Sequence, residues 1–184
     1  MTNFTYQISQ EIINEKMAQL QKRIRYHFEN VQLLMQAMYA KRVKTDLASK
    51  NHREYANEQL AIVGDAVLGA VISDLLYTKG AKSKADLSKR KAKLVNNNLL
   101  YDFLEQYKLI DFAFNDDHFY DDVYIPLDEQ VGHNRHDAYI EAIVGAIYYD
   151  GGYDKAQHWI QTYLLPRLHR TIKHNNGPLI IYKK

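Results

Sequence analysis

The sequence predicts an all-helical protein, and three observations support this fold class. Only three prolines and eight glycines interrupt its 184 residues. Between them, apolar residues recur every three or four positions, as they do along one face of an α-helix. Two stretches, from about residue 54 to 77 and from about 137 to 149, are mostly apolar. We therefore expect two central helices, the first of them buried on most of its faces.

Two shorter helices are expected before the first central helix. Five apolar residues between positions 12 and 24 fall on one stripe, which predicts an amphipathic helix over about residues 10–25. Asn30 can cap a second helix, because asparagine accepts a hydrogen bond from a free N–H group of the first turn. Residues 41–53 are polar and predict a loop.

A basic helix follows the first central helix. Ser83 or Asp86 can cap it, and three asparagines at 96–98 indicate a break before another helix that runs through Tyr107. Residues 115–132 are acidic, aromatic and without a regular period, so we expect a loop.

The C-terminal part of the chain predicts one more helix. Gly151 and Gly152 form a stop signal for the second central helix. The last helix is expected over about residues 155–172, bent or interrupted at Pro166, and a short tail follows over residues 173–184.

Composition indicates one globular domain over residues 1–184, with its core at about 26–168. Apolar residues make up 46% and charged residues 25% of the chain. We find no signal peptide and no apolar run that reaches the length needed to cross a bilayer. The sequence has no cysteine, which excludes disulfides and thiolate metal sites and agrees with a cytoplasmic location. Because the net charge is only +2, nucleic-acid binding has to be argued from where the charges lie.

Two carboxylates stand in the middle of the two apolar segments. Asp65 lies within LAIVGDAVLGAVI and Glu141 within AYIEAIVGAIYY. A buried carboxylate needs a cation, a donor network or a metal. Gly64 and Gly145 allow a close approach of the helices, so both carboxylates could converge on Mg²⁺, which prefers oxygen ligands. Alternatively, each pairs with a lysine or arginine or reaches solvent at a helix edge.

Four segments resemble, in order, motifs of the ribonuclease III nuclease domain, and they span about residues 26–166. They are FENVQLLMQAM, NEQLAIVGDAVLGAVISDLLY, ADLSKRKAKLVNNNLL and DAYIEAIVGAIYYDGG. The last three are similar to the family's ERLEFLGDAVL, ELSRLRAALVNEETLA and DVFEALIGAIYLDGG. The resemblance implies a single helical endonuclease domain that forms a homodimer. It also implies cleavage of double-stranded RNA that depends on Mg²⁺, with Mn²⁺ as a plausible substitute and no small-molecule cofactor.

The resemblance also assigns the site residues. It implies that Asp65 and Glu141 bind the metal and that Glu58, the first glutamate of the signature motif, is a third catalytic residue. Two family carboxylates are missing, because Ala61 and Ala138 occupy their positions.

Two interpretations of the missing carboxylates stay open. A compact branch of the family, Mini-III, has motifs close to LALAYIGDA and STAFEALLGYLYL, which also lack them. That likeness favours an active enzyme and suggests processing of ribosomal RNA. The alternative is a degenerate dimeric module that binds RNA or ribosomes without cutting. Asp137 is one position away from the missing aspartate, and we expect it to support the site rather than bind the metal.

Two surfaces are expected to serve RNA binding and dimerisation. Clustered lysines suit duplex RNA, whose shape and phosphates are recognised with little base readout, although a solvated helix face would look the same. The candidates are Lys79, Lys82, Lys84, Lys89, Arg90, Lys91 and Lys93. The resemblance implies a dimer contact at Ile62 and Val63. His133 and His136 are interpreted as loop histidines.

Overall fold

The part of the chain that the structure describes is built from helices. This computed structural model describes residues 9–39, 57–114 and 137–176. The elements are α1 (Gln10–Ile24), α2 (Val31–Met38), α3 (Glu58–Thr78), α4 (Lys84–Leu94), α5 (Asn97–Gln106), the 3-10 helix η2 (Ile110–Phe112), α6 (Asp137–Trp159), the π-helix η3 (Ile160–Leu164) and α7 (Leu165–Asn176). Over these residues the only strand-like pairing is an isolated bridge between Tyr39 and Phe114. The predicted all-helical class is confirmed.

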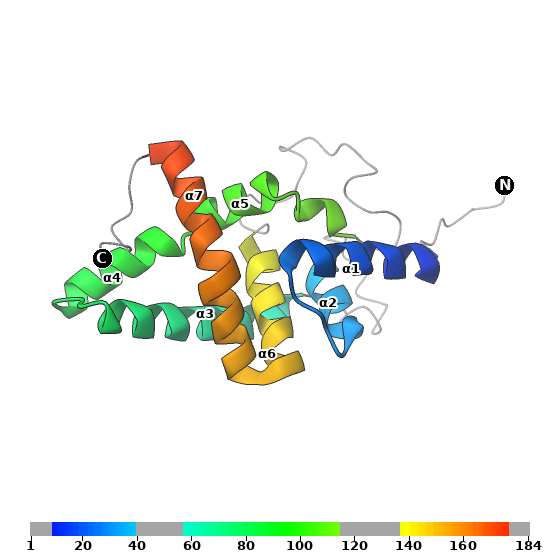
Figure 1. Cartoon of the computed structure of the whole chain (residues 1–184), viewed down its shortest axis with the longest axis horizontal. Helices are drawn as coiled ribbons and strands as arrows, with labels where there is room; N and C mark the ends of the chain where they lie inside the picture. The colour runs from blue at the N-terminus through cyan, green and yellow to red at the C-terminus, as the bar shows by residue number, and fades with distance from the viewer. Residues whose placement is uncertain (1–8, 40–56, 115–136, 177–184) are drawn as a thin grey trace, which may run out of the picture.

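The two mostly apolar helices, α3 and α6, form the centre of the molecule and make the most extensive contact between any two elements. In Figure 1, α1 and α2 lie to one side of α6, and α4 lies to the other side, above α3. The buried side chains of all these helices join in one apolar core. The predicted loops at 41–53 and 115–132 lie outside the described residues, as do His133 and His136.

Side-chain caps explain where the shorter helices begin. The Asn30 side chain accepts a hydrogen bond from the backbone N–H of Gln32 (3.1 Å), as predicted for the start of α2. At the start of α4, Ser83 is the cap and accepts from the N–H of Asp86 (3.1 Å). Asp86 instead accepts from the N–H of Lys82 (3.0 Å). The sequence did not distinguish between Ser83 and Asp86 as the cap. In the structure Ser83 caps α4, and Asp86 in the first turn accepts a hydrogen bond from the residue before the cap.

The C-terminal helices are interrupted where glycine and proline predict it. Gly152 leaves the helical conformation inside α6 (φ 80°, ψ −179°), a region that glycine adopts without the steric cost of a Cβ atom. The π-helix η3 lies directly before α7, in which Pro166 is the second residue. Proline lacks an N–H and crowds the carbonyl four residues earlier, so the widened turn avoids that clash.

Two expectations about helix lengths and composition are wrong. The last helix extends to Asn176, so residues 173–176 do not belong to the tail. These residues are polar and carry no apolar period, but the next helix breaker is Gly177. Also, α3 is long and apolar enough to cross a bilayer, contrary to our expectation for this chain. Half of the apolar stretch of α3 is buried against other parts of the structure, as in the core helix of a globular protein.

A carboxylate clamp fixes the turn between α1 and α2 onto α6. Asp150 accepts hydrogen bonds from the Tyr26 hydroxyl (2.9 Å) and from the backbone N–H groups of Glu29 (3.2 Å) and Asn30 (2.8 Å). Burial and this hydrogen bond raise the pKa of Tyr26 well above its usual value. A second tie is the indole N–H of Trp159, which donates to the carbonyl of Ile24 (2.8 Å).

Candidate active site

The crossing of α3 and α6 is a direct contact between two backbones. A Cβ atom on Gly64 would overlap the carbonyl of Glu141 and would lie 2.8 Å from the backbone nitrogen of Gly145. A Cβ atom on Gly145 would overlap the carbonyl of Leu60. Each helix therefore needs glycine at the crossing, and the predicted role of these two glycines is confirmed. The contact also fixes the position of Asp65, the residue after Gly64, relative to Glu141.

The two carboxylates differ in their exposure. Asp65 is exposed, so the expectation that it is buried is wrong. Glu141 is half-buried on the neighbouring helix. Asp65 makes no side-chain hydrogen bond or ion pair with the other residues that the structure describes. The site is therefore open to solvent on the α3 side, where a large substrate can approach.

The other predicted acidic positions contribute less to this cluster. Glu58 is exposed in the first turn of α3, seven residues before Asp65 and therefore on nearly the same face. Ala61 is only 6% exposed and packs into the core, whereas Ala138 is half-buried. Asp137 is the first residue of α6.

Within the part of the chain that the structure describes, Asp65 and Glu141 are the two candidate metal ligands. Among residues 9–39, 57–114 and 137–176, no three histidine, aspartate or glutamate side chains gather closely enough to hold an ion. Asp65 and Glu141 supply the oxygen donors that Mg²⁺ prefers, and Mg²⁺ commonly keeps several waters and takes ligands from substrate phosphates. The two residues fit an ion of this kind, but they do not make a complete protein cage.

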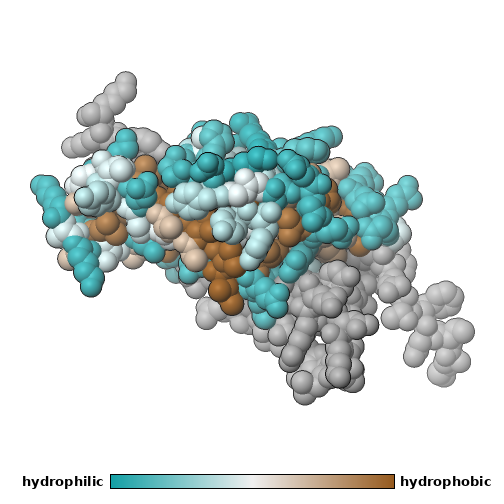
Figure 2. Space-filling view, turned by 90° about the horizontal axis from the view of Figure 1, so that it is seen from below, coloured by the Kyte–Doolittle hydropathy of each residue, from teal (hydrophilic) through white to brown (hydrophobic). Residues whose placement is uncertain are grey.

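The face of α3 beside Asp65 is apolar and exposed. Ile62 and Tyr77 are each 74% exposed, and Ala66 and Ala70 between them are exposed as well, whereas Val63 is half-buried. Figure 2, which shows the molecule of Figure 1 from below, has hydrophobic surface between hydrophilic residues. The expectation that α3 is buried on most faces is therefore wrong for this stripe.

The cations of α4 and of the turn before it fall into three groups. The Arg90 side chain donates through Nε to Asp86 (2.8 Å), so this group already has an anionic partner within the helix. Hydrogen bonds from the Lys82 N–H and from Arg90 lower the pKa of Asp86. The exposed cations are Lys79, Lys82, Lys84, Lys89 and Lys93. Lys91 is half-buried and points toward α3. Arg90 is therefore a weaker candidate for RNA binding than its neighbours.

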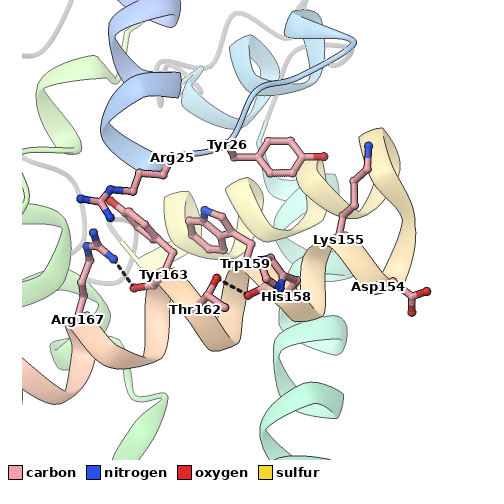
Figure 3. A pocket seen from close by; sticks show the side chains of 9 residues that line it. All are labelled: Arg25, Tyr26, Asp154, Lys155, His158, Trp159, Thr162, Tyr163 and Arg167. Atoms are coloured by element: carbon pink, nitrogen blue, oxygen red, sulfur yellow. Dashed lines mark hydrogen bonds between the residues drawn. The ribbon is translucent and has the colours of Figure 1, made fainter.

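A separate hollow of about 520 Å³ lies at the junction of α1, α6 and η3, and none of the predicted site residues lines it. Figure 3 shows Arg25 and Tyr26 on one side, and Trp159 and Tyr163 on the other. The Arg167 guanidinium lies 3.7 Å from the centre of the Tyr163 ring, and it donates a hydrogen bond to the backbone carbonyl of Tyr163 (3.0 Å). Sequence reasoning missed this hollow because its two sides are more than a hundred positions apart in the chain.

Comparisons with known proteins identify the family of this chain. The family model described as Ribonuclease-III-like matches residues 30–168. A Ribonuclease 3 from Ehrlichia canis is 33% identical over 149 residues, which are 78% of this chain and 60% of that protein. One from Bacillus velezensis is 30% identical over 159 residues, 84% of this chain and 59% of that protein. The chain thus spans about 60% of the length of these relatives.

A solved structure gives the same assignment. The nuclease domain of ribonuclease III from Campylobacter jejuni superposes with a TM-score of 0.62 and 27% identity, and the match covers 87% of this chain and 98% of that one. That structure is described as flexible in a region involved in dimer formation. The match to the family model and the shared helical fold lead to one conclusion: the chain belongs to the ribonuclease-III-like family.

Proposed function

We propose that this protein is a metal-dependent endoribonuclease that cleaves double-stranded RNA at Asp65 and Glu141. One observation carries the proposal: the backbones of α3 and α6 touch at Gly64 and Gly145, so the main chain of Glu141 lies against the residue that precedes the exposed Asp65. Asp65 has no cation partner among the described residues, and its exposure to solvent leaves its oxygens accessible to a hydrated metal ion. Membership of the ribonuclease-III-like family supports the reaction type.

The two carboxylates would hold Mg²⁺, or Mn²⁺ in its place. The ion supplies a Lewis acid for the phosphate and a bound water of lowered pKa. Asp65 and Glu141 fix the position of that charge from two helices, and the exposed side of Asp65 leaves room for substrate oxygens. Glu58, on nearly the same face of α3, would orient water or substrate. Cleavage is expected to leave 5′-phosphate and 3′-hydroxyl ends.

The exposed stripe on α3 supports a homodimer. Leaving Ile62 and Tyr77 in water is unfavourable, since burial of apolar surface stabilises by roughly 25 cal/mol per Å². A second copy that covers the stripe would bring two sites to one RNA duplex, one for each strand. The cations of α4 would contact phosphates of that duplex. We further propose RNA processing in the cytoplasm, including processing of ribosomal RNA, without a membrane or a small-molecule cofactor.

Cleavage of a labelled RNA duplex in the presence of Mg²⁺ tests the enzyme directly. We expect Asp65→Asn and Glu141→Gln each to lower the single-turnover rate by at least about 100-fold. Each substitution removes one of the two negative charges with which the protein would bind the metal ion. The matched control is Asp74→Asn, an exposed carboxylate on another face of α3, which should leave the rate unchanged. Equal rates for all four proteins would refute the assignment.

A second candidate function follows from the missing carboxylates. Ala61 is packed in the core, and the described residues offer only two of the family's metal ligands. A degenerate dimeric module that binds RNA or ribosomes without cutting is therefore the alternative. The same assay separates the two: duplex binding without cleavage at any concentration of Mg²⁺ or Mn²⁺ favours the module.

A further inference from the structure

The side chain of Lys91 crosses from α4 to α3 and ends against Gly69. A Cβ atom on Gly69 would lie 2.8 Å from the ammonium nitrogen of Lys91 and 3.6 Å from its Cε. Lys91 is half-buried, whereas Lys89 and Lys93 of the same helix are exposed. Gly69 thus leaves the space that this ammonium group occupies, and it stands inside a helix, where glycine is less favourable than alanine.

The position of Gly69 brings this ammonium close to the candidate active site. Gly69 follows Asp65 by four residues, so the two lie on one side of α3, about 6 Å apart along the axis. The Cα–Cβ bond of a helical residue tilts toward the N-terminus of the helix. The space beside Gly69 that a Cβ atom would fill, and that the Lys91 ammonium borders, therefore lies on the side of Gly69 that faces Asp65.

Lys91 and Asp65 do not pair with each other. Neither side chain makes a hydrogen bond or ion pair within the described part of the chain. A carboxylate and an ammonium group about one helical turn apart, without direct contact, leave a gap between opposite charges. A metal-bound phosphate would fill such a gap, with its metal on the carboxylate and a free oxygen toward the ammonium.

We propose that Lys91 binds the phosphate that is cleaved at Asp65, and that the exposed lysines of α4 contact other phosphates of the duplex. This proposal rests on the proposed nuclease function. A lysine ammonium is a compact point charge with three donors and stays protonated while it holds a phosphate oxygen. Partial burial strengthens its attraction for charge that builds on that oxygen during cleavage. Lys91 would then affect the rate, whereas Lys93 would affect affinity.

Single-turnover cleavage and duplex affinity, measured on the full chain, test the proposal. We expect Lys91→Met, which keeps an unbranched stem, to lower the cleavage rate by about 100-fold. The comparison within α4, Lys93→Met, should weaken duplex binding at least as much as Lys91→Met does and lower the cleavage rate of bound duplex far less. The control, Lys22→Met at an exposed lysine of α1, should leave both rate and affinity unchanged. Lys91→Arg should restore part of the rate, because it restores the charge. Denaturant unfolding of each variant verifies that it is folded.

The substitution Gly69→Ala distinguishes a role of Lys91 in cleavage from a purely structural role. The added methyl displaces only the flexible end of Lys91, so we expect it to slow cleavage in the wild type and to have no further effect in Lys91→Met. Additive effects, or a Lys91→Met rate equal to that of Lys93→Met, would overturn the proposal while leaving the nuclease intact. A wild-type protein that does not cleave duplex RNA would overturn both.

Discussion

Gly64 of α3 lies directly against the main-chain carbonyl of Glu141 in α6, with no room for a side chain between them. The reciprocal contact joins Gly145 to the carbonyl of Leu60. Asp65 is the residue after Gly64, so it follows directly on this contact with the main chain of Glu141. The geometry of the candidate site is therefore set by two backbones rather than by flexible side chains.

Gly64→Ala and Gly69→Ala should change stability in opposite directions, although both replace glycine within α3. The methyl group at residue 64 meets backbone that cannot move aside, and we expect a loss of about 1–3 kcal/mol or more in the free energy of unfolding. The methyl group at residue 69 meets only a lysine ammonium, so the gain in helix propensity should give up to about 1 kcal/mol. Urea denaturation measures both. Equal destabilisation would contradict the packing described for the crossing.

The Asp150 clamp should contribute measurably to stability. Asp150→Ala leaves two backbone N–H groups and the Tyr26 hydroxyl without their acceptor, and we expect a loss of about 2–3 kcal/mol. Asp154→Ala, at an exposed position four residues later, is the matched control and should stay within about 0.5 kcal/mol. If thermal and urea unfolding show the same stability for both variants, the clamp has no energetic role.

The dimer contact can be tested at Ile62. Replacing it with aspartate places a charge in the stripe that a second copy would cover, so sedimentation should shift from dimer to monomer while the helical content stays native. Ile12→Asp is the matched control, because Ile12 is 44% exposed on α1 and lies far from α3 in the chain. A dimer that survives Ile62→Asp would show that the contact lies elsewhere.

Most of the fold could be predicted from the sequence because its signals are local. The apolar stripe of α1, the caps at Asn30 and Ser83 and the stop at Gly152 each involve residues within a few positions of one another. The type of interruption before Pro166 could not be predicted, because a kink and a π-helix both relieve the same clash.

The candidate site was only partly predictable. The sequence identified Asp65 and Glu141 but not their different exposure. Because Ile62 and Ala66 are apolar, the sequence predicts that α3 is buried on most faces. An exposed apolar face that binds another copy of the chain has the same composition as a face buried in the core. Lys91 could not be distinguished from the neighbouring lysines, because its contact with Gly69 depends on how α4 lies on α3.

Manganese bound to crystals of the full chain tests the central claim most directly, since its anomalous scattering locates the ion without any need for activity. We predict one peak between the side chains of Asp65 and Glu141, with the remaining ligands supplied by water. The peak should disappear in Asp65→Asn and persist in Asp74→Asn. No peak at this position, or a peak that binds other side chains, would contradict the metal site proposed here.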